Sequence, residues 1–98
     1  MNDQTKKKDA GKPQLHRAPT AMIRGTARVL EYGAKKYGDQ SDHWDEVEEI
    51  RYIDAAYRHL LAIIDGEDAD KESGLPHIWH LACNAGFLCA LRERRCKE

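Results

Sequence analysis

"PHIWHLACNAGFLCALRERR", residues 76–95, is the stretch that decides the fold of this 98-residue chain. If it is helical, its apolar side chains lie on almost all sides instead of along one stripe, and Pro76 suits the first turn of a helix. A helix of this kind needs partners on several sides. We therefore expect residues 76–95 to form the middle helix of an all-α domain.

Two amphipathic segments precede this helix. Residues 20–37 have an apolar stripe at helical spacing, with Thr20 as the expected N-cap and Gly38 as the stop. Residues 44–65 have a second stripe, and Gly66 closes them. Two such helices hardly cover a third that is apolar all round. We therefore expect a small bundle of about three helices, completed by oligomerisation with further copies of the chain.

The first 18 residues differ in composition from residues 19–98, which we expect to form the all-α domain. They are polar, contain Gly11 and Pro13, and predict a flexible basic arm. Residues 1–19 carry five basic and two acidic side chains, within a chain whose net charge is −1. No aromatic residue lies among the lysines to stack on bases, which argues against a nucleic-acid partner.

The chain has no apolar run near the roughly 18 residues of a membrane span, and its N-terminus lacks a signal-peptide core. Its three cysteines form no CxxC pair. Cys83 and Cys89 lie in an apolar segment and are expected to be small buried hydrophobes, whereas Cys96 is expected to be an exposed thiol. A reducing compartment suits these cysteines, so we expect a cytoplasmic protein without membrane contacts.

Common metal and nucleotide motifs are absent. The acidic stretch at residues 65–72 is not an EF-hand, because counting from Asp65 places Ala69 where an acidic ligand is needed. His77 and His80 lack the HExxH frame of zinc proteases. The chain also has no Walker loop and no GxGxxG. Any ligand site must therefore be assembled from separate helices.

Polar residues occur on helix faces that we expect to be buried. His77, His80 and Asn84 share one face of the third helix at i, i+3 and i+7. Asp54 and Glu31 lie beside the apolar stripes of the other two helices, and a buried charge is costly without a partner. Three helices of this composition can surround a divalent ion or a polar ligand. Oxygen-rich ligands would favour Mg²⁺ or Mn²⁺ over zinc, and such ions clamp phosphates and activate water.

Each candidate also has a purely structural alternative. A lone interior histidine such as His59 is usually a satisfied core residue. Asp54 can pair with an arginine one turn away on its own helix, and Glu31 can pair with Lys35. The carboxylates at residues 65–72 can belong to a solvated loop. The residues alone leave these alternatives open.

Several segments resemble, in the same order along the chain, a small phage family, the dATP/dGTP diphosphohydrolases. That family is similar to the MazG-like all-α nucleotide pyrophosphohydrolases. The segments are "KPQLHRAP" (12–19), "ARVLEYGAKKYGD" (27–39), "HW" (43–44), "DAAYRHLLAIIDGED" (54–68) and "ESGLPHIWHLACNAGFL" (72–88). The resemblance implies an oligomeric helical hydrolase that cleaves purine deoxynucleoside triphosphates to monophosphate and pyrophosphate. It also implies a requirement for Mg²⁺ or Mn²⁺ and a role in phage nucleotide metabolism.

The candidate site residues lie almost entirely within these matched segments. We predict metal ligands at Glu31, Asp54 and Glu72, and catalytic roles at His59 and His77, which would contact phosphate or orient water. The predicted substrate-binding residues are Lys12, Lys35, Lys36, Tyr37, Trp44, His80 and Asn84. Glu67 and Asp70 are candidates for a lid or for additional ligands.

The chain departs from the MazG-like pattern in one respect. MazG-like enzymes carry an ExxE on one helix and an ExxD on the next, but here Glu31 is followed by Ala34 and Lys35. An ExxE at Glu46 and Glu49 lies at the entrance to the second helix and is given no metal role. An alternative function is therefore a non-catalytic phage protein that binds and sequesters a signalling nucleotide of host defence.

Overall fold

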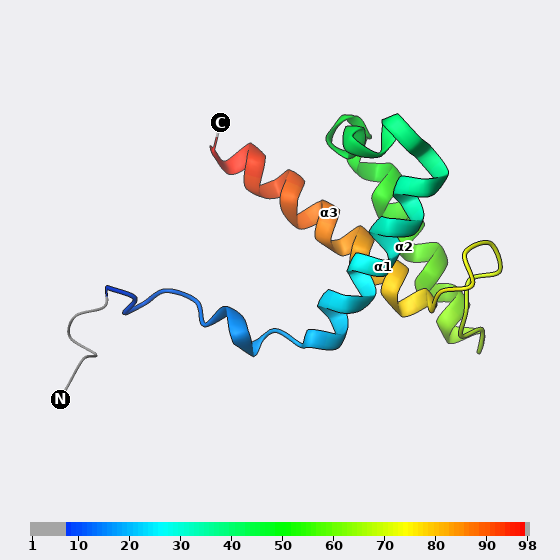
Figure 1. The fold of residues 1–98 in the computed structure, drawn as a ribbon, viewed down its shortest axis with the longest axis horizontal. Helices are drawn as coiled ribbons and strands as arrows, with labels where there is room; N and C mark the ends of the chain where they lie inside the picture. The colour runs from blue at the N-terminus through cyan, green and yellow to red at the C-terminus, as the bar shows by residue number, and fades with distance from the viewer. Residues whose placement is uncertain (1–7, 98) are drawn as a thin grey trace.

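The computed structural model describes residues 8–97 and is built from helices (Figure 1). Between these residues the chain forms no β-strand, only an isolated bridge between Ala69 and Pro76. The prediction of an all-α fold with three helices is confirmed. The helices are α1 (Thr20–Tyr37), α2 (Glu49–Ile64) and α3 (His77–Lys97), with 3₁₀ segments η2 (Leu15–Arg17) and η3 (Gly38–Glu46).

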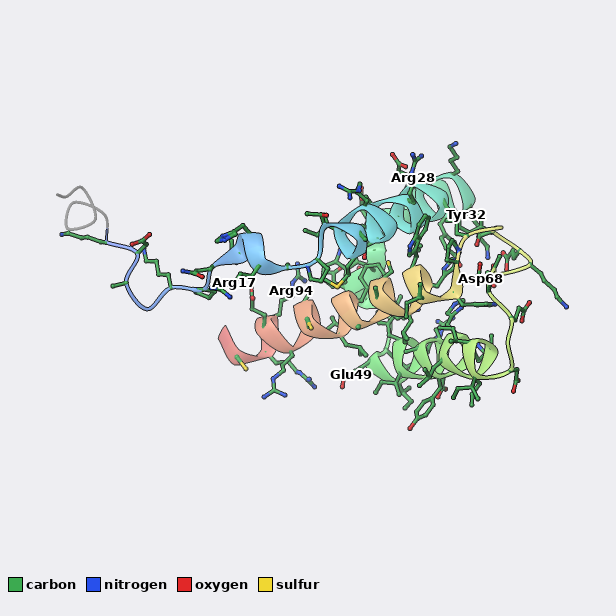
Figure 2. The ribbon with its side chains drawn as sticks, turned by 90° about the horizontal axis from the view of Figure 1, so that it is seen from below. Arg17, Arg28, Tyr32, Glu49, Asp68 and Arg94 are labelled. Carbon is green, nitrogen blue, oxygen red and sulfur yellow. The ribbon has the colours of Figure 1, made fainter. Side chains whose placement is uncertain are left out.

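The third helix lies in the middle, as its all-round apolar sequence predicts. It packs against both α1 and α2, whereas these two helices do not pack against each other within the described residues. Figure 2 shows α3 between them. The approach of α1 depends on Gly25, because a Cβ built there would lie 2.5 Å from Cδ1 of Trp79. A glycine in α1 thus makes room for an indole ring of α3.

The first helix has the expected length but not the expected cap. It begins with Thr20 itself and is preceded by Pro19, and no side chain caps it. The carbonyl of Pro19 accepts the amides of Met22 and Ile23, so the hydroxyl of Thr20 is free to accept a hydrogen bond from Arg24. The prediction of a Thr20 cap is therefore wrong. Gly38 ends the helix at a φ of 58°, as expected.

The second helix begins later than the sequence predicts. We expected residues 44–65 to be helical, but Val47 and Glu48 are extended and α2 starts at Glu49. The preceding segment is folded onto α3, because the Trp44 ring stacks on Phe87. The Tyr52 hydroxyl, from α2, donates a 2.6 Å hydrogen bond to the Trp44 carbonyl. These contacts fix Trp44 against α2 and α3, so η3 is a separate segment and not a continuation of α2.

The interior of the chain is small. Among the described hydrophobic residues only Val29 and Cys83 are buried. Both α1 and α2 present uncovered apolar stripes, and Ile78 is exposed in the first turn of α3. The exposed large apolar residues are Leu15, Met22, Ile23, Leu30, Tyr37, Ile50, Tyr57, Leu60, Leu61, Ile64 and Ile78.

The residues before α1 lie apart from the helices. From residue 8 to Pro19 the chain extends away from them, interrupted by η2 (Figure 1). Lys6 and Lys7, part of the predicted basic arm, lie outside the described residues. No helix in the described part of the chain is both long and apolar enough to cross a membrane.

The cysteines give a direct check on the packing of α3. Cys83 is buried, and burial raises the pKa of its thiol to about 11. Cys96 is exposed as expected, but Cys89 is exposed too, so the prediction of a buried Cys89 is wrong. We expect a thiol-reactive disulfide reagent at pH 8 to modify Cys89 and Cys96 rapidly and Cys83 only after denaturation. The thiolate is the reactive form, and Cys83 is buried with a raised pKa. Equal labelling of all three in the folded protein, measured by peptide mass spectrometry, would contradict this packing.

Candidate functional site

Three histidines meet where the end of α2 faces the start of α3. His59 comes from α2, and His77 and His80 lie in the first turn of α3. His77 is 5% exposed and the other two are half-buried. The rings of His59 and His80 stack with centroids 4.6 Å apart, and Nδ1 of His59 lies 2.9 Å from Nδ1 of His77. The i, i+3 spacing on α3 thus brings two imidazoles to one imidazole of α2.

The acidic loop between α2 and α3 is folded against this cluster. The amide of Ser73 donates to Oδ2 of Asp70 at 2.8 Å, and the Ser73 hydroxyl accepts from the amide of Leu75. The same hydroxyl lies 2.7 Å from Nε2 of His80. The amide of His77 donates to the carbonyl of Asp68. Residues 65–72 therefore do not form a merely solvated loop, because the Asp68 carbonyl is bonded to the start of α3 and the Asp70 carboxylate to the amide of Ser73.

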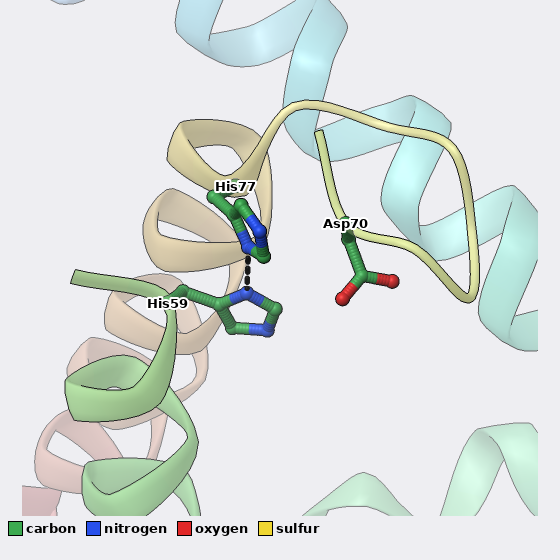
Figure 3. A group of neighbouring side chains, drawn as sticks. All are labelled: His59, Asp70 and His77. Atoms are coloured by element: carbon green, nitrogen blue, oxygen red, sulfur yellow. Dashed lines mark hydrogen bonds between the residues drawn. The ribbon is translucent and has the colours of Figure 1, made fainter. Parts of the chain in front are cut away.

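This folding brings a carboxylate beside two of the imidazoles. One ligand atom each from His59, Asp70 and His77 lies within 4.8 Å of the other two, a geometry that can hold a metal ion. Figure 3 shows His59 on α2, His77 on α3 and Asp70 hanging from the loop. The donors are two nitrogens and one carboxylate. The site is therefore less rich in oxygen than the sequence led us to expect.

The surroundings favour the neutral form of His59 and of His80 and the ionised form of Asp70. Burial lowers the pKa of both His59 and His80, and the neighbouring imidazoles lower that of His59 further. Partial burial alone would raise the pKa of Asp70. The hydrogen bonds from Ser73 outweigh that effect, and the pKa of Asp70 lies below its usual value. Neutral imidazoles with free lone pairs and an ionised carboxylate are the forms that bind metal ions.

A second carboxylate faces the most buried histidine. Oε2 of Glu67 lies 3.5 Å from Nε2 of His77, within ion-pair range but beyond a normal hydrogen bond. Nε2 of His77 is buried and has no hydrogen-bond partner among the residues that the structure describes. A buried polar atom without a hydrogen bond is uncommon in a folded protein, and it often indicates a functional role.

Glu72, a predicted metal ligand, lies on the other side of the loop. Its carboxylate pairs with the Lys36 ammonium and accepts a 3.2 Å hydrogen bond from the Tyr32 hydroxyl. These two partners lower the pKa of Glu72, the lysine most, and the same contact raises the pKa of Lys36. The pair joins the loop to α1, and Glu72 is not among the three residues grouped as possible metal ligands.

Glu31 and Asp54 do not lie on buried faces, so that prediction is wrong. Both are exposed, and neither joins the group of possible metal ligands. The reason is the openness of the fold, because the outer sides of α1 and α2 have no covering layer in the described residues. Glu31 lies 4.0 Å from Arg28 at i−3 and not beside Lys35. The structure does not bring Glu31, Asp54 and Glu72 together as one cage.

The two aromatic residues among the predicted substrate-binding residues, Trp44 and Tyr37, have partners within the chain. Trp44 stacks on Phe87 and carries the Arg94 guanidinium over its ring. Phe87 is ten residues along α3 from His77, which is about 15 Å at helical rise. The Lys36 ammonium lies over the Tyr37 ring, and Tyr37 remains 57% exposed.

Two further predicted substrate-binding residues, Lys12 and Asn84, make none of the described ring contacts with the three histidines. Lys12 is exposed, in the segment that precedes α1. The Asn84 amide donates to the carbonyl of His80 on its own helix. The structure therefore gives Asn84 a bond within α3 that the sequence spacing alone does not reveal.

A basic pocket adjoins the histidines on the side of α1. This open pocket of about 200 Å³ is lined by Arg28, Lys35, Tyr32 and Ser73, together with Glu31 and Leu75. Ser73 connects it to His80 through their hydrogen bond. Lys35 was a predicted substrate-binding residue, whereas Arg28, Tyr32 and Ser73 were missed. The signal for Ser73 was its spacing from Asp70, three residues before it and typical of a side-chain-capped turn.

The chain matches known proteins along nearly its whole length. A family model described as "dATP/dGTP diphosphohydrolase, N-terminal" matches residues 2–98. A protein of Salmonella phage PMBT28 named dATP/dGTP diphosphohydrolase is 35% identical over 87 residues, which are 89% of this chain and 29% of that protein. This chain therefore spans less than a third of the length of that relative. No solved structure matches it. The chain belongs to the family of dATP/dGTP diphosphohydrolase N-terminal domains.

Proposed function

We propose that this protein takes part in metal-dependent hydrolysis of purine deoxynucleoside triphosphates, dATP and dGTP, to monophosphate and pyrophosphate in phage nucleotide metabolism. The observation that carries the proposal is the meeting of His59, His77 and Asp70 at one end of the helices. The name of the phage relative supports the substrate class. Mg²⁺ or Mn²⁺ is the proposed cofactor, since divalent ions neutralise phosphate charge and activate water.

The residues around the cluster suit a triphosphate. Arg28 and Lys35 line the pocket beside His80, and two cations at its wall favour an anionic ligand. Lys36 is held in a close pair with Glu72, whereas the pair of Arg28 with Glu31 is exposed and spans 4.0 Å, so we assign phosphate contact chiefly to Arg28 and Lys35. Neutral His59 can accept a proton from water or hydrogen-bond to phosphate. The bound ion would supply charge stabilisation at the phosphates.

We also propose that the active form is a homo-oligomer. The exposed apolar residues of α1 and α2 support this, because contiguous apolar surface on a folded chain usually marks a contact with another chain. Helices of a second copy would cover these stripes. Sedimentation or light scattering across a range of concentrations tests the proposal.

Hydrolysis is tested by separating the products after incubation with each of four dNTPs. We expect monophosphate and pyrophosphate from dATP and dGTP in Mn²⁺ or Mg²⁺, and none in EDTA. His59→Ala is expected to lower turnover by about 100-fold or more, since a positioned proton acceptor or ligand contributes at least that much. His43→Ala is the matched control, because His43 pairs with Glu46 in η3 and does not belong to the cluster of His59, Asp70 and His77. Turnover that survives His59→Ala would remove the cluster from the mechanism.

The alternative function remains nucleotide binding without turnover. It is favoured by one observation, that the phage relative has more than two thirds of its length outside the match. Intact nucleotides under every condition, combined with a rise in melting temperature on adding a nucleotide, would support a sequestering role, because a ligand stabilises the folded state by mass action. Cyclic nucleotides should be included in that screen.

A further inference from the structure

The closest contact in the histidine cluster joins two like atoms. Nδ1 of His59 and Nδ1 of His77 lie 2.9 Å apart. Two neutral imidazoles can share one hydrogen bond here if one nitrogen carries the proton. Two nitrogens bound at about 2.1 Å to one ion and at a right angle to each other would also be about 3.0 Å apart. The spacing therefore suits neighbouring ligands of a single ion.

The other nitrogen of His77 indicates which way its lone pair points. Nε2 is buried, without a hydrogen bond, and faces Oε2 of Glu67 at 3.5 Å. A lone pair at Nε2 would be repelled by that carboxylate, so the proton belongs on Nε2. The lone pair then lies on Nδ1 and is directed at His59. A ligating histidine whose other N–H faces a carboxylate is the usual arrangement in metal sites.

A third ligand completes the set. Asp70 is held by the Ser73 amide at Oδ2, and one of its oxygens lies within 4.8 Å of one ring nitrogen of His59 and one of His77. Three protein ligands from one side leave positions open for water or phosphate.

We propose that Nδ1 of His59, Nδ1 of His77 and the Asp70 carboxylate bind one divalent transition-metal ion, with Glu67 orienting His77. Two imidazole donors favour Mn²⁺, Co²⁺ or a similar ion over Mg²⁺, which prefers oxygen ligands and retains its waters. This deepens the proposed function by naming the ligands and the class of ion. It also replaces Glu31, Asp54 and Glu72 as the ligand set.

The test uses the whole chain and no nucleotide. Metal-free protein is titrated with Co²⁺, followed by visible absorption and by equilibrium dialysis, and then challenged with Mn²⁺ or Mg²⁺. We expect one Co²⁺ per chain, displaced by Mn²⁺ at far lower concentration than by Mg²⁺. Glu67→Gln is expected to weaken binding about 10-fold, within the range of about 10- to 100-fold found for residues that orient a ligand. His59→Ala and Asp70→Asn remove a ligand and are expected to weaken binding by about 100-fold or more, beyond that range. Asp54→Asn, an exposed carboxylate on the same helix as His59, should bind like the wild type.

Circular dichroism of each variant separates loss of a ligand from loss of the fold. Unchanged binding by folded His59→Ala and Asp70→Asn, or absence of Co²⁺ binding by the wild type, would overturn the proposed site. Stoichiometric binding with the expected variant pattern but no nucleotide hydrolysis would overturn the proposed function and leave the site standing. Hydrolysis in Mg²⁺ that persists in His59→Ala and Asp70→Asn would overturn the assignment of this metal site to the hydrolytic reaction.

Discussion

Gly25→Ala is expected to destabilise the protein by up to about 2 kcal/mol, because forcing extra volume into a packed contact costs about 1–3 kcal/mol. The new methyl group would lie 2.5 to 2.7 Å from three atoms of the Trp79 indole. Alanine is favoured over glycine in a helix by about 1 kcal/mol, which offsets only part of this cost. The free energy of unfolding should therefore fall, measured by denaturant titration at one fixed protein concentration.

Gly33→Ala is the matched control on the same helix. A Cβ at Gly33 meets nothing within 4 Å, so this substitution should raise stability by up to about 1 kcal/mol. Opposite signs for the two substitutions would confirm that α1 meets α3 at Gly25. Equal stabilisation by both would show that the two helices do not approach as described.

The contact also has a functional consequence. Arg28 and Lys35 are carried on α1, whereas His77 and His80 are carried on α3. If Gly25→Ala pushes the helices apart, the basic pocket moves away from the histidines. We expect the KM for a nucleotide substrate to rise in this variant, while Gly33→Ala leaves it unchanged.

The helices were predictable because their signals are local. The span of α1 follows from a periodic stripe bounded by Pro19 and Gly38, and the central place of α3 follows from its lack of a polar face. The start of α2 was not predictable in the same way. Residues 44–46 can continue the helical pattern of α2 in sequence, but Trp44 contacts Phe87, more than forty residues later, and these residues belong to the separate 3₁₀ segment η3.

The site was predictable only in part, for a related reason. The spacing of His77 and His80 places them on one face of α3, and both were identified. The partner of His77 depends on how the loop folds, and no periodicity describes a loop. Asp70 was given only a secondary role, because the hydrogen bonds from Ser73 that position it form between loop residues. Glu31 and Asp54 were overvalued since their faces were assumed to be covered.

His77→Leu is expected to have the largest effect on activity, a loss of about 100-fold or more, without a matching loss of stability. The buried Nε2 of His77 has no hydrogen bond, and an unsatisfied buried polar atom costs about 1–3 kcal/mol. A leucine of similar size removes that cost. It leaves Nδ1 of His59 without its neighbour, but His59 is half-buried, so water can reach it. Thermal unfolding in EDTA should therefore show a melting temperature equal to or above that of the wild type.

His80→Leu provides the contrast, because Nε2 of His80 already has a partner in the Ser73 hydroxyl. Losing that bond should lower stability by about 1 kcal/mol, the typical net worth of a hydrogen bond. Adding Mn²⁺ should raise the melting temperature of the wild type and of His80→Leu but not of His77→Leu, since only a protein that binds the ion is stabilised by it. This pattern would indicate that His77 is retained for ion binding, at a position where a leucine side chain would pack better. An unfolded His77→Leu variant would show instead that His77 serves the fold. A folded variant that retains turnover would show that the reaction does not need His77.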